Sequence, residues 1–217
     1  MTPTEIEALF TRADGSFLCA RWDRPVVPVV FGVEEATLAV VKGAIEAVVA
    51  HAGHRMAGTD PELGANLMVF FFRDWSELPQ VPNLDRLIPD LGPLCGRLGA
   101  AGANQYRAFR YDPAGAIRAA FVFLRMDSHL AALPAADLAL AQAVQAMLSW
   151  GERAFAEVSP LARDGDRVVL RPDIAALVRA AYDPVLPPVS RDASHALRLA
   201  ARLAGGGFGL GSGRGGT

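Results

Sequence analysis

Two histidines close together in the chain are the first residues whose types and spacing suggest chemistry. His51 and His54 are separated by two residues near the end of a predicted helix, so both imidazoles could face one metal ion. A closed zinc site needs further ligands, and Asp60 and Glu62 are candidates a little further along the chain. Histidines near a helix C-terminus also complement the helix dipole at the protein surface. We favour this surface role over a metal site.

A second group contains the residue types of a hydrolase triad. Asp127, Ser128 and His129 are adjacent, but neighbouring side chains of an extended chain point to opposite sides, so Ser128 would not share a face with the other two. The chain has no GxSxG, GxxxxGK[ST] or HExxH motif, and no GxGxxG after a predicted strand, so no cofactor is predicted. A metal-dependent hydrolase would need a site assembled from dispersed residues such as His51, His54, His129 and Asp127.

A polar stripe on the longest predicted helix, residues 135–158, is the strongest candidate for a binding surface. Apolar residues such as Val144 recur there at helical spacing and predict one buried face. Beside that face lie polar residues separated by three or four positions: Gln142, Gln145, Ser149 and Glu152. The stripe could line a cleft, although periodicity alone favours an ordinary solvated helix face.

The composition is that of one folded domain without a nucleic-acid surface. Of the 217 residues, 52% are hydrophobic and 20% are charged, with a formal net charge of −2. This balance excludes the disordered class and gives no basic surface for nucleic acid. The mean hydropathy is +0.24, but no stretch approaches the roughly 18 apolar residues that a spanning helix needs. We therefore expect no membrane partner.

The cysteines and the first residues of the chain suggest a cytoplasmic location. Cys19 and Cys95 are far apart and form neither a CxxC motif nor a disulfide framework. Residues 1–13 carry Glu5 and Glu7 and lack the basic start and apolar core of a secretion signal. A reducing cytoplasm is the simplest expectation.

Strand patterns occupy the first two thirds of the chain. Residues 26–33 predict a strand that lies at a sheet edge or carries a bulge, because Pro28 cannot donate a ladder hydrogen bond. The apolar run at residues 66–72 predicts a central strand. A short strand at residues 16–22 and a hairpin of residues 105–111 and 117–126 complete the predicted sheet.

Helical patterns alternate with these strands and dominate the C-terminal part. A helix is predicted from Glu34 to about Gly53, and prolines divide the segment 73–102 into short helical turns. Two further helices are predicted near residues 172–182 and 192–204. The expected organisation is an N-terminal helix and turn, one α+β domain and a disordered glycine-rich tail: residues 1–16, 17–204 and 205–217.

Several short motifs resemble a bacterial family of secreted, zincin-like proteins, domain of unknown function 2927. Arg21-Trp22 followed by Pro25-Val26 resembles its first tryptophan-proline strand, and Ala65-Asn66-Leu67 resembles its asparagine-led second strand. Leu170-Arg171-Pro172-Asp173 and the segment 179–186, which contains Tyr182-Asp183-Pro184, resemble its closing segment. The resemblance extends from about Phe17 to Leu203.

This resemblance implies a twisted sheet packed on two helices, of which the second, residues 135–158, bears the active-site signature. The family has glutamates ahead of an Ala-Gln pair there, whereas this chain has Ala141-Gln142-Ala143-Val144-Gln145. An amide cannot accept a proton from a metal-bound water as a carboxylate does, and it is a poor zinc ligand. We therefore interpret the chain as a divergent, catalytically silent relative.

Three functions remain open from the sequence. The leading hypothesis is a non-catalytic, pseudo-metallopeptidase-like module that binds a protein or peptide in a cleft beside Gln142, Gln145, Ser149 and Glu152. The first alternative is the metal-dependent hydrolase with dispersed ligands. The second is a structural subunit of an assembly, docked through the proline-rich segment 78–93.

Overall fold

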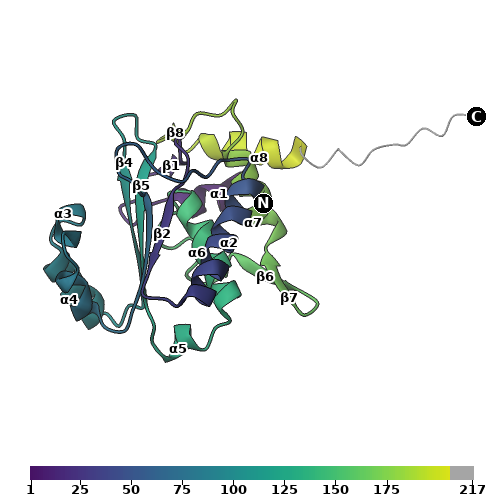
Figure 1. Ribbon diagram of the computed structural model, residues 1–217. Helices are drawn as coiled ribbons and strands as arrows, with labels where there is room; N and C mark the ends of the chain where they lie inside the picture. Colours follow the sequence, from purple (N-terminus) through teal and green to yellow (C-terminus); the bar gives the residue numbers. More distant parts are fainter. Residues whose placement is uncertain (206–217) are drawn as a thin grey trace, which may run out of the picture.

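A computed structural model describes residues 1–205 of the chain as an α+β fold (Figure 1). Its elements are α1 (Pro3–Phe10), β1 (Cys19–Ala20), β2 (Pro28–Phe31), α2 (Glu35–His51), β3 (Leu67–Phe72), η1 (Trp75–Gln80), α3 (Leu84–Leu87), α4 (Leu91–Ala100), β4 (Gln105–Tyr111), β5 (Ile117–Arg125), α5 (Ser128–Ala131), α6 (Ala135–Met147), β6 (Leu161–Asp164), β7 (Arg167–Leu170), α7 (Pro172–Ala181), β8 (Val189–Ser190) and α8 (His195–Gly205). Apart from Gly205, the predicted disordered tail lies outside the described residues.

The main sheet has four strands in the order β2-β3-β5-β4. β2, β3 and β5 are parallel, and β4 is antiparallel to β5. The sequence correctly predicted β2 at an edge, β3 in the centre and β4–β5 as a hairpin. The predicted strand at residues 16–22 is shorter than expected, since within it only Cys19–Ala20 forms a strand, paired with β8.

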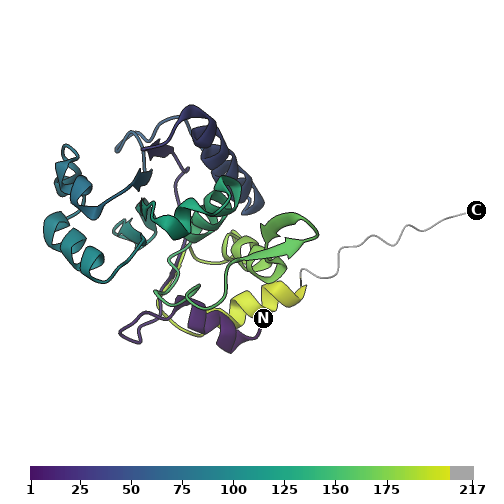
Figure 2. The same ribbon diagram turned by 90° about the horizontal axis from the view of Figure 1, so that it is seen from below.

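Helices cover both faces of this sheet. α2 and α6 lie side by side on one face, and η1, α3 and α4 lie on the other (Figure 2). In the segment 73–102 the prolines separate short helices, as predicted, and Leu84, Ile88 and Leu91 are buried against the sheet. Most apolar side chains of the predicted docking segment 78–93 therefore belong to the protein's own core. None of the described helices combines the length and apolarity needed to cross a lipid bilayer.

The helix that bears the candidate stripe ends at Met147, so the prediction of a helix over residues 135–158 was wrong beyond that residue. Leu148 is extended and pairs with Arg21, and the Ser149 amide donates to the Ala20 carbonyl over 3.0 Å. Gly151 then approaches α1 so closely that an added Cβ would lie 2.2 Å from the Thr11 carbonyl oxygen. Pairing with the N-terminal segment thus overrides the helical periodicity.

Three aromatic side chains satisfy carbonyl groups at this helix end. The last four carbonyls of an α-helix have no partner within the helix. In α6, Trp150 Nε1 donates to the Val144 carbonyl (3.1 Å), Trp22 Nε1 to Ala146 (2.9 Å) and the Tyr182 hydroxyl to Met147 (2.8 Å). All three side chains are buried, so the helix end is satisfied inside the core rather than by water.

The substitution Tyr182→Phe should lower the free energy of unfolding by about 1–3 kcal/mol, because it leaves a buried carbonyl without its donor. Burial raises the pKa of Tyr182, so its hydroxyl remains protonated and able to donate. Tyr106→Phe is the control, since Tyr106 makes no side-chain hydrogen bond within residues 1–205, and should change stability by less than about 0.5 kcal/mol. Urea unfolding measures both, and equal losses would contradict the assigned role.

Candidate functional site

An open depression of about 1330 Å³ lies along β4, and we call it the β4 cleft. Every residue of β4 lines it. The remaining wall comes from the N-terminal turn, from α5 and α6, and from the chain between Trp150 and Arg163. The departure of the chain from helix at Met147 therefore builds one side of the cleft.

The main chain of β4 presents the hydrogen-bonding groups of its outer edge to this cleft. β4 pairs with β5 on one side and, among residues 1–205, with no strand on the other. The Arg125 amide donates to the Asn104 carbonyl, and the antiparallel register then directs the backbone groups of Tyr106 and Ala108 toward β5. The amides and carbonyls of the alternate residues, Gln105, Arg107 and Phe109, consequently point away from the sheet. Of these groups, the Phe109 carbonyl accepts from Arg110 Nη1 over 3.2 Å.

A cluster of two amides and a guanidinium connects β4 to α6 at this cleft. Arg107 Nη2 donates to Gln142 Oε1 (3.0 Å) and to Gln105 Oε1 (3.2 Å), and Gln142 Nε2 donates to Gln105 Oε1 (2.8 Å). Arginine has only donors, so both amide oxygens must face it. Burial lowers the pKa of Arg107 to about 10, which leaves the guanidinium charged at neutral pH.

The structure places the four predicted stripe residues in different environments. Gln142 and Gln145 are on α6 and line the cleft, and Glu152 lines it from the loop beyond the helix. Ser149 does not: its buried hydroxyl donates to the Leu18 carbonyl (3.1 Å) and accepts from the Ala20 amide (2.7 Å). The prediction of one helical stripe was therefore wrong for Ser149 and Glu152, because α6 ends before either residue.

Glu152 closes the rim of the cleft against the N-terminal turn. Its carboxylate accepts from the Ala13 amide (2.9 Å) and lies 3.6 Å from Arg12 Nη1. Arg12 also donates to the Tyr111 hydroxyl at the end of β4 (3.0 Å). This exposed carboxylate therefore has partners within the protein.

The residues of the alternative metal site are not brought together. His51 Nε2 donates to the Ala175 carbonyl (2.9 Å) and His54 Nε2 to the Arg24 carbonyl (2.8 Å). His129 is in α5, which follows β5 at the end of the sheet where α2 begins, whereas His51 is at the far end of α2, about 25 Å along a helix of 17 residues (Figure 1).

Asp127, the fourth member of that set, caps α5. Its carboxylate accepts from the amides of His129 and Leu130, and these bonds help lower its pKa. Within the described residues, no three His, Cys, Asp or Glu side chains are arranged to hold a metal ion.

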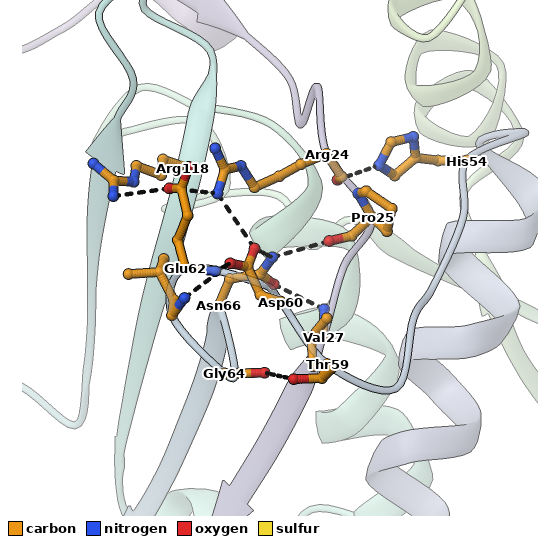
Figure 3. Close-up of polar contacts among 11 residues, drawn as sticks. Arg24, Pro25, Val27, His54, Thr59, Asp60, Glu62, Gly64, Asn66 and Arg118 are labelled. Carbon is orange, nitrogen blue, oxygen red and sulfur yellow. Dashed lines mark hydrogen bonds and ion pairs between the residues drawn. The ribbon is translucent and has the colours of Figure 1, made fainter.

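A polar cluster around Asn66 and Asp60 has a structural role (Figure 3). Buried Asn66 accepts from the Val27 amide (2.8 Å) and donates to the Pro25 carbonyl (2.9 Å) and to Asp60 (3.0 Å). Asp60 also accepts from two amides of its own turn and pairs with Arg24 over 3.3 Å. Its acceptors are thus used to hold the loop before β3 against the chain that enters β2.

Sequence reasoning did not single out Arg107 and Gln105, although a signal was present. Strand alternation in β4 places Gln105 and Arg107 on the same face as Phe109 and Tyr111, which pack toward the core under α6. A polar pair on the apolar face of a strand could have marked these residues. Their meeting with Gln142 depended on the tertiary packing of α6.

Asp60→Asn should make stability less dependent on pH in acid. Burial alone would raise the pKa of Asp60, but hydrogen bonds from Leu63, Glu62 and Asn66 and the contact with Arg24 lower it below its ordinary value of 3.8. The carboxylate therefore stabilises the fold fully above about pH 4, and this contribution is lost as the pH falls through the lowered value. Asp60→Asn should cost about 1–3 kcal/mol at pH 7.

Urea unfolding of wild type and Asp60→Asn at several pH values measures this effect. The difference between the two proteins should shrink as the pH falls below 4. A difference that stays constant between pH 7 and pH 2.5 would refute the role assigned to the ionised carboxylate. Asp166→Asn, at the exposed turn between β6 and β7, is the control for acidic surface residues, because the Asp166 carboxylate makes no hydrogen bond or ion pair within residues 1–205.

Gln142→Ala should lower the free energy of unfolding by about 1–3 kcal/mol, because it removes an acceptor from a half-buried guanidinium. Gln145→Ala is the matched control on the same helix. Within residues 1–205 the Gln145 amide bonds only to the Ala141 carbonyl, one turn earlier (3.1 Å), so its loss should cost less than about 0.5 kcal/mol. Thermal and urea unfolding measure both, and a larger loss for Gln145→Ala would contradict this assignment.

Comparison with known proteins does not place the chain in a family. No protein-family model, no curated protein and no solved structure matches it. The resemblance to domain of unknown function 2927 therefore stays a prediction. The residues behind it have structural roles here, since Trp22 and Tyr182 bind the end of α6 and Asn66 holds the loop before β3.

Proposed function

We propose that this chain is a non-catalytic binding module that holds an extended segment of a partner protein along β4. The observation that carries the proposal is that all of β4 lines an open cleft while its outer main-chain groups have no strand to pair with. Unpaired edges promote addition of another strand, and proteins usually cover them. Here the edge instead faces a space large enough for another chain.

Strand addition gives this site a source of affinity that does not depend on sequence. Main-chain hydrogen bonds with Gln105, Arg107 and the Phe109 amide would hold the segment, and pockets beneath alternate side chains would select it. Only alternate residues of the segment would point toward α6, because side chains of a strand alternate between faces. Gln142 and Gln145 would contact those residues from below.

The chemistry of the cleft supports binding rather than catalysis. Its central groups are amides and a guanidinium, which donate and accept hydrogen bonds but do not exchange a proton near neutral pH. His129 lines the cleft, while Asp127 beside it in sequence is occupied as the cap of α5. Within residues 1–205 the His129 imidazole makes no hydrogen bond to a hydroxyl or thiol that it could activate as a nucleophile, which supports recognition as the role of the cleft.

We further propose a distant relationship to the zincin-like family resembled by the sequence. Two features support it: α2 and α6 pack under one face of the sheet, and Gln142 of the Ala141-Gln142 pair faces the cleft. The amide at this position would then replace an ancestral carboxylate. Loss of the charged group with retention of the cleft is what a pseudoenzyme that keeps its binding mode would display.

Strand addition predicts which amides become protected when a peptide binds. In the free protein, the amides of Arg107 and Phe109 should exchange with solvent faster than those of Ala108 and Arg110, which bond to β5. A peptide selected from a random linear library should slow exchange at the first pair and leave the second unchanged. Amide exchange followed by NMR measures this contrast.

Methylation of the peptide's backbone nitrogens provides a second test. Methyl groups should abolish binding at alternate positions, where the nitrogen faces β4, and should be tolerated between them. A bound peptide that leaves exchange at Arg107 and Phe109 unchanged would overturn the proposal. So would the failure of a large library to yield any binding peptide.

A further inference from the structure

Arg107 is a charged side chain without a charged partner at the floor of the β4 cleft. Only Nη2 of its guanidinium bonds to a described residue, and Nε is buried with no hydrogen-bond partner. None of the ion pairs within residues 1–205 includes Arg107. The folded protein thus contains a fixed positive charge whose counter-charge does not come from the described chain.

This arrangement costs free energy that a ligand could recover. A charge taken from water is stabilised when an opposite charge lies against it, and amide dipoles replace only part of that stabilisation. Gln105 and Gln142 hold the guanidinium in place through Nη2 and leave Nη1 without a partner among residues 1–205. A carboxylate is the group that matches such donors best, since charge-assisted bonds to arginine are about twice as strong as neutral ones.

Other arginines with a buried Nε do not share this situation. Arg118 pairs with Glu62 over 3.0 Å, and Arg21 lies over the Tyr182 ring, 5.5 Å from its centroid. Neither lines the β4 cleft. The acidic residues that do line the cleft include Glu152, which is paired with Arg12. Arg107 alone combines a buried Nε without a hydrogen-bond partner, a position in the cleft and the lack of an ionic partner among residues 1–205.

Strand geometry connects this charge to one position of the bound segment. Arg107 is one of the residues whose backbone groups face outward, so a segment added to β4 has a residue directly opposite it. Side chains of directly opposite residues lie on the same face, with Cβ atoms about 4.5–5.5 Å apart. The side chain opposite Arg107 therefore enters the space above Gln142.

We infer that the partner segment carries aspartate or glutamate opposite Arg107, and that Arg107 is the specificity-determining residue of the cleft. This inference rests on the proposed function. The carboxylate is assigned to a side chain rather than to a chain terminus. β4 lines the cleft over its whole length, so the bound segment can continue past Arg107 in both directions.

The experiment uses a phage library of random heptapeptides embedded between fixed flanking residues. Selected peptides should share an acidic residue at one position. A synthetic peptide with blocked ends and its acid-to-amide counterpart are then compared by fluorescence titration. The amide peptide should bind wild type at least about 10-fold more weakly.

Arg107→Gln should bind both peptides with similar affinity. Arg118→Gln is the control and should retain the preference, because Arg118 does not line the β4 cleft and pairs with Glu62.

A second variant keeps the inference testable if Arg107→Gln fails to fold. Gln142→Glu supplies a resident carboxylate at the position that now lies 3.0 Å from Arg107 Nη2. It should fold at least as stably as wild type and should bind the acidic peptide at least about 10-fold more weakly. Unchanged binding to Gln142→Glu would overturn the inference.

The remaining outcomes separate this inference from the proposed function. Peptides that protect the Arg107 and Phe109 amides but tolerate the acid-to-amide change would overturn the acidic assignment alone. Selection that succeeds only with a free C-terminus would overturn the side-chain assignment in favour of a terminal carboxylate. If no peptide binds and the protein sediments as a dimer whose two copies pair through β4, the inference and the proposed function are both overturned.

Discussion

The C-terminal end of α6 is the point on which the rest of the structure depends. The carbonyl groups of the last turn of a helix need hydrogen-bond donors from outside the helix. In α6 these donors are Trp22, Trp150 and Tyr182, from three separate parts of the chain. The helix cannot continue past Met147 without displacing these donors. The same contacts therefore end α6 and hold Trp22, after β1, and Tyr182, at the end of α7, against it. They also direct the residues from Trp150 onward along the β4 cleft.

The β4 cleft is formed because α6 ends at Met147 and because β4 runs antiparallel at the edge of the sheet. β4 is the one antiparallel strand of the four-stranded sheet, and it lies at the sheet edge beside α6. Its outward backbone groups and the side chains of Gln105 and Arg107 consequently meet Gln142 on one surface. On this surface the amides of Gln105 and Gln142 are held by the Arg107 guanidinium, and amides do not accept a proton near neutral pH.

Local patterns predicted most elements because local physics decides them. Pro28 cannot donate within a ladder, and β2 is indeed an edge strand; the apolar run before Arg73 is the central strand β3; Pro113 and Gly115 mark the turn between β4 and β5. The prediction of a helix through Val158 was wrong because periodicity does not register competing long-range bonds. Ser149 has helical spacing but bonds to Leu18 and Ala20.

The sequence by itself determined the α+β class, the order of strands and helices, and the absence of the usual catalytic motifs, since these depend on residue type and short spacing. Only the tertiary structure decided which polar residues share a site. Gln142 lies 35 residues from Arg107 in sequence, and 3.0 Å separates their bonded atoms. No local rule encodes such a contact, because it depends on how an entire helix packs beneath an entire sheet.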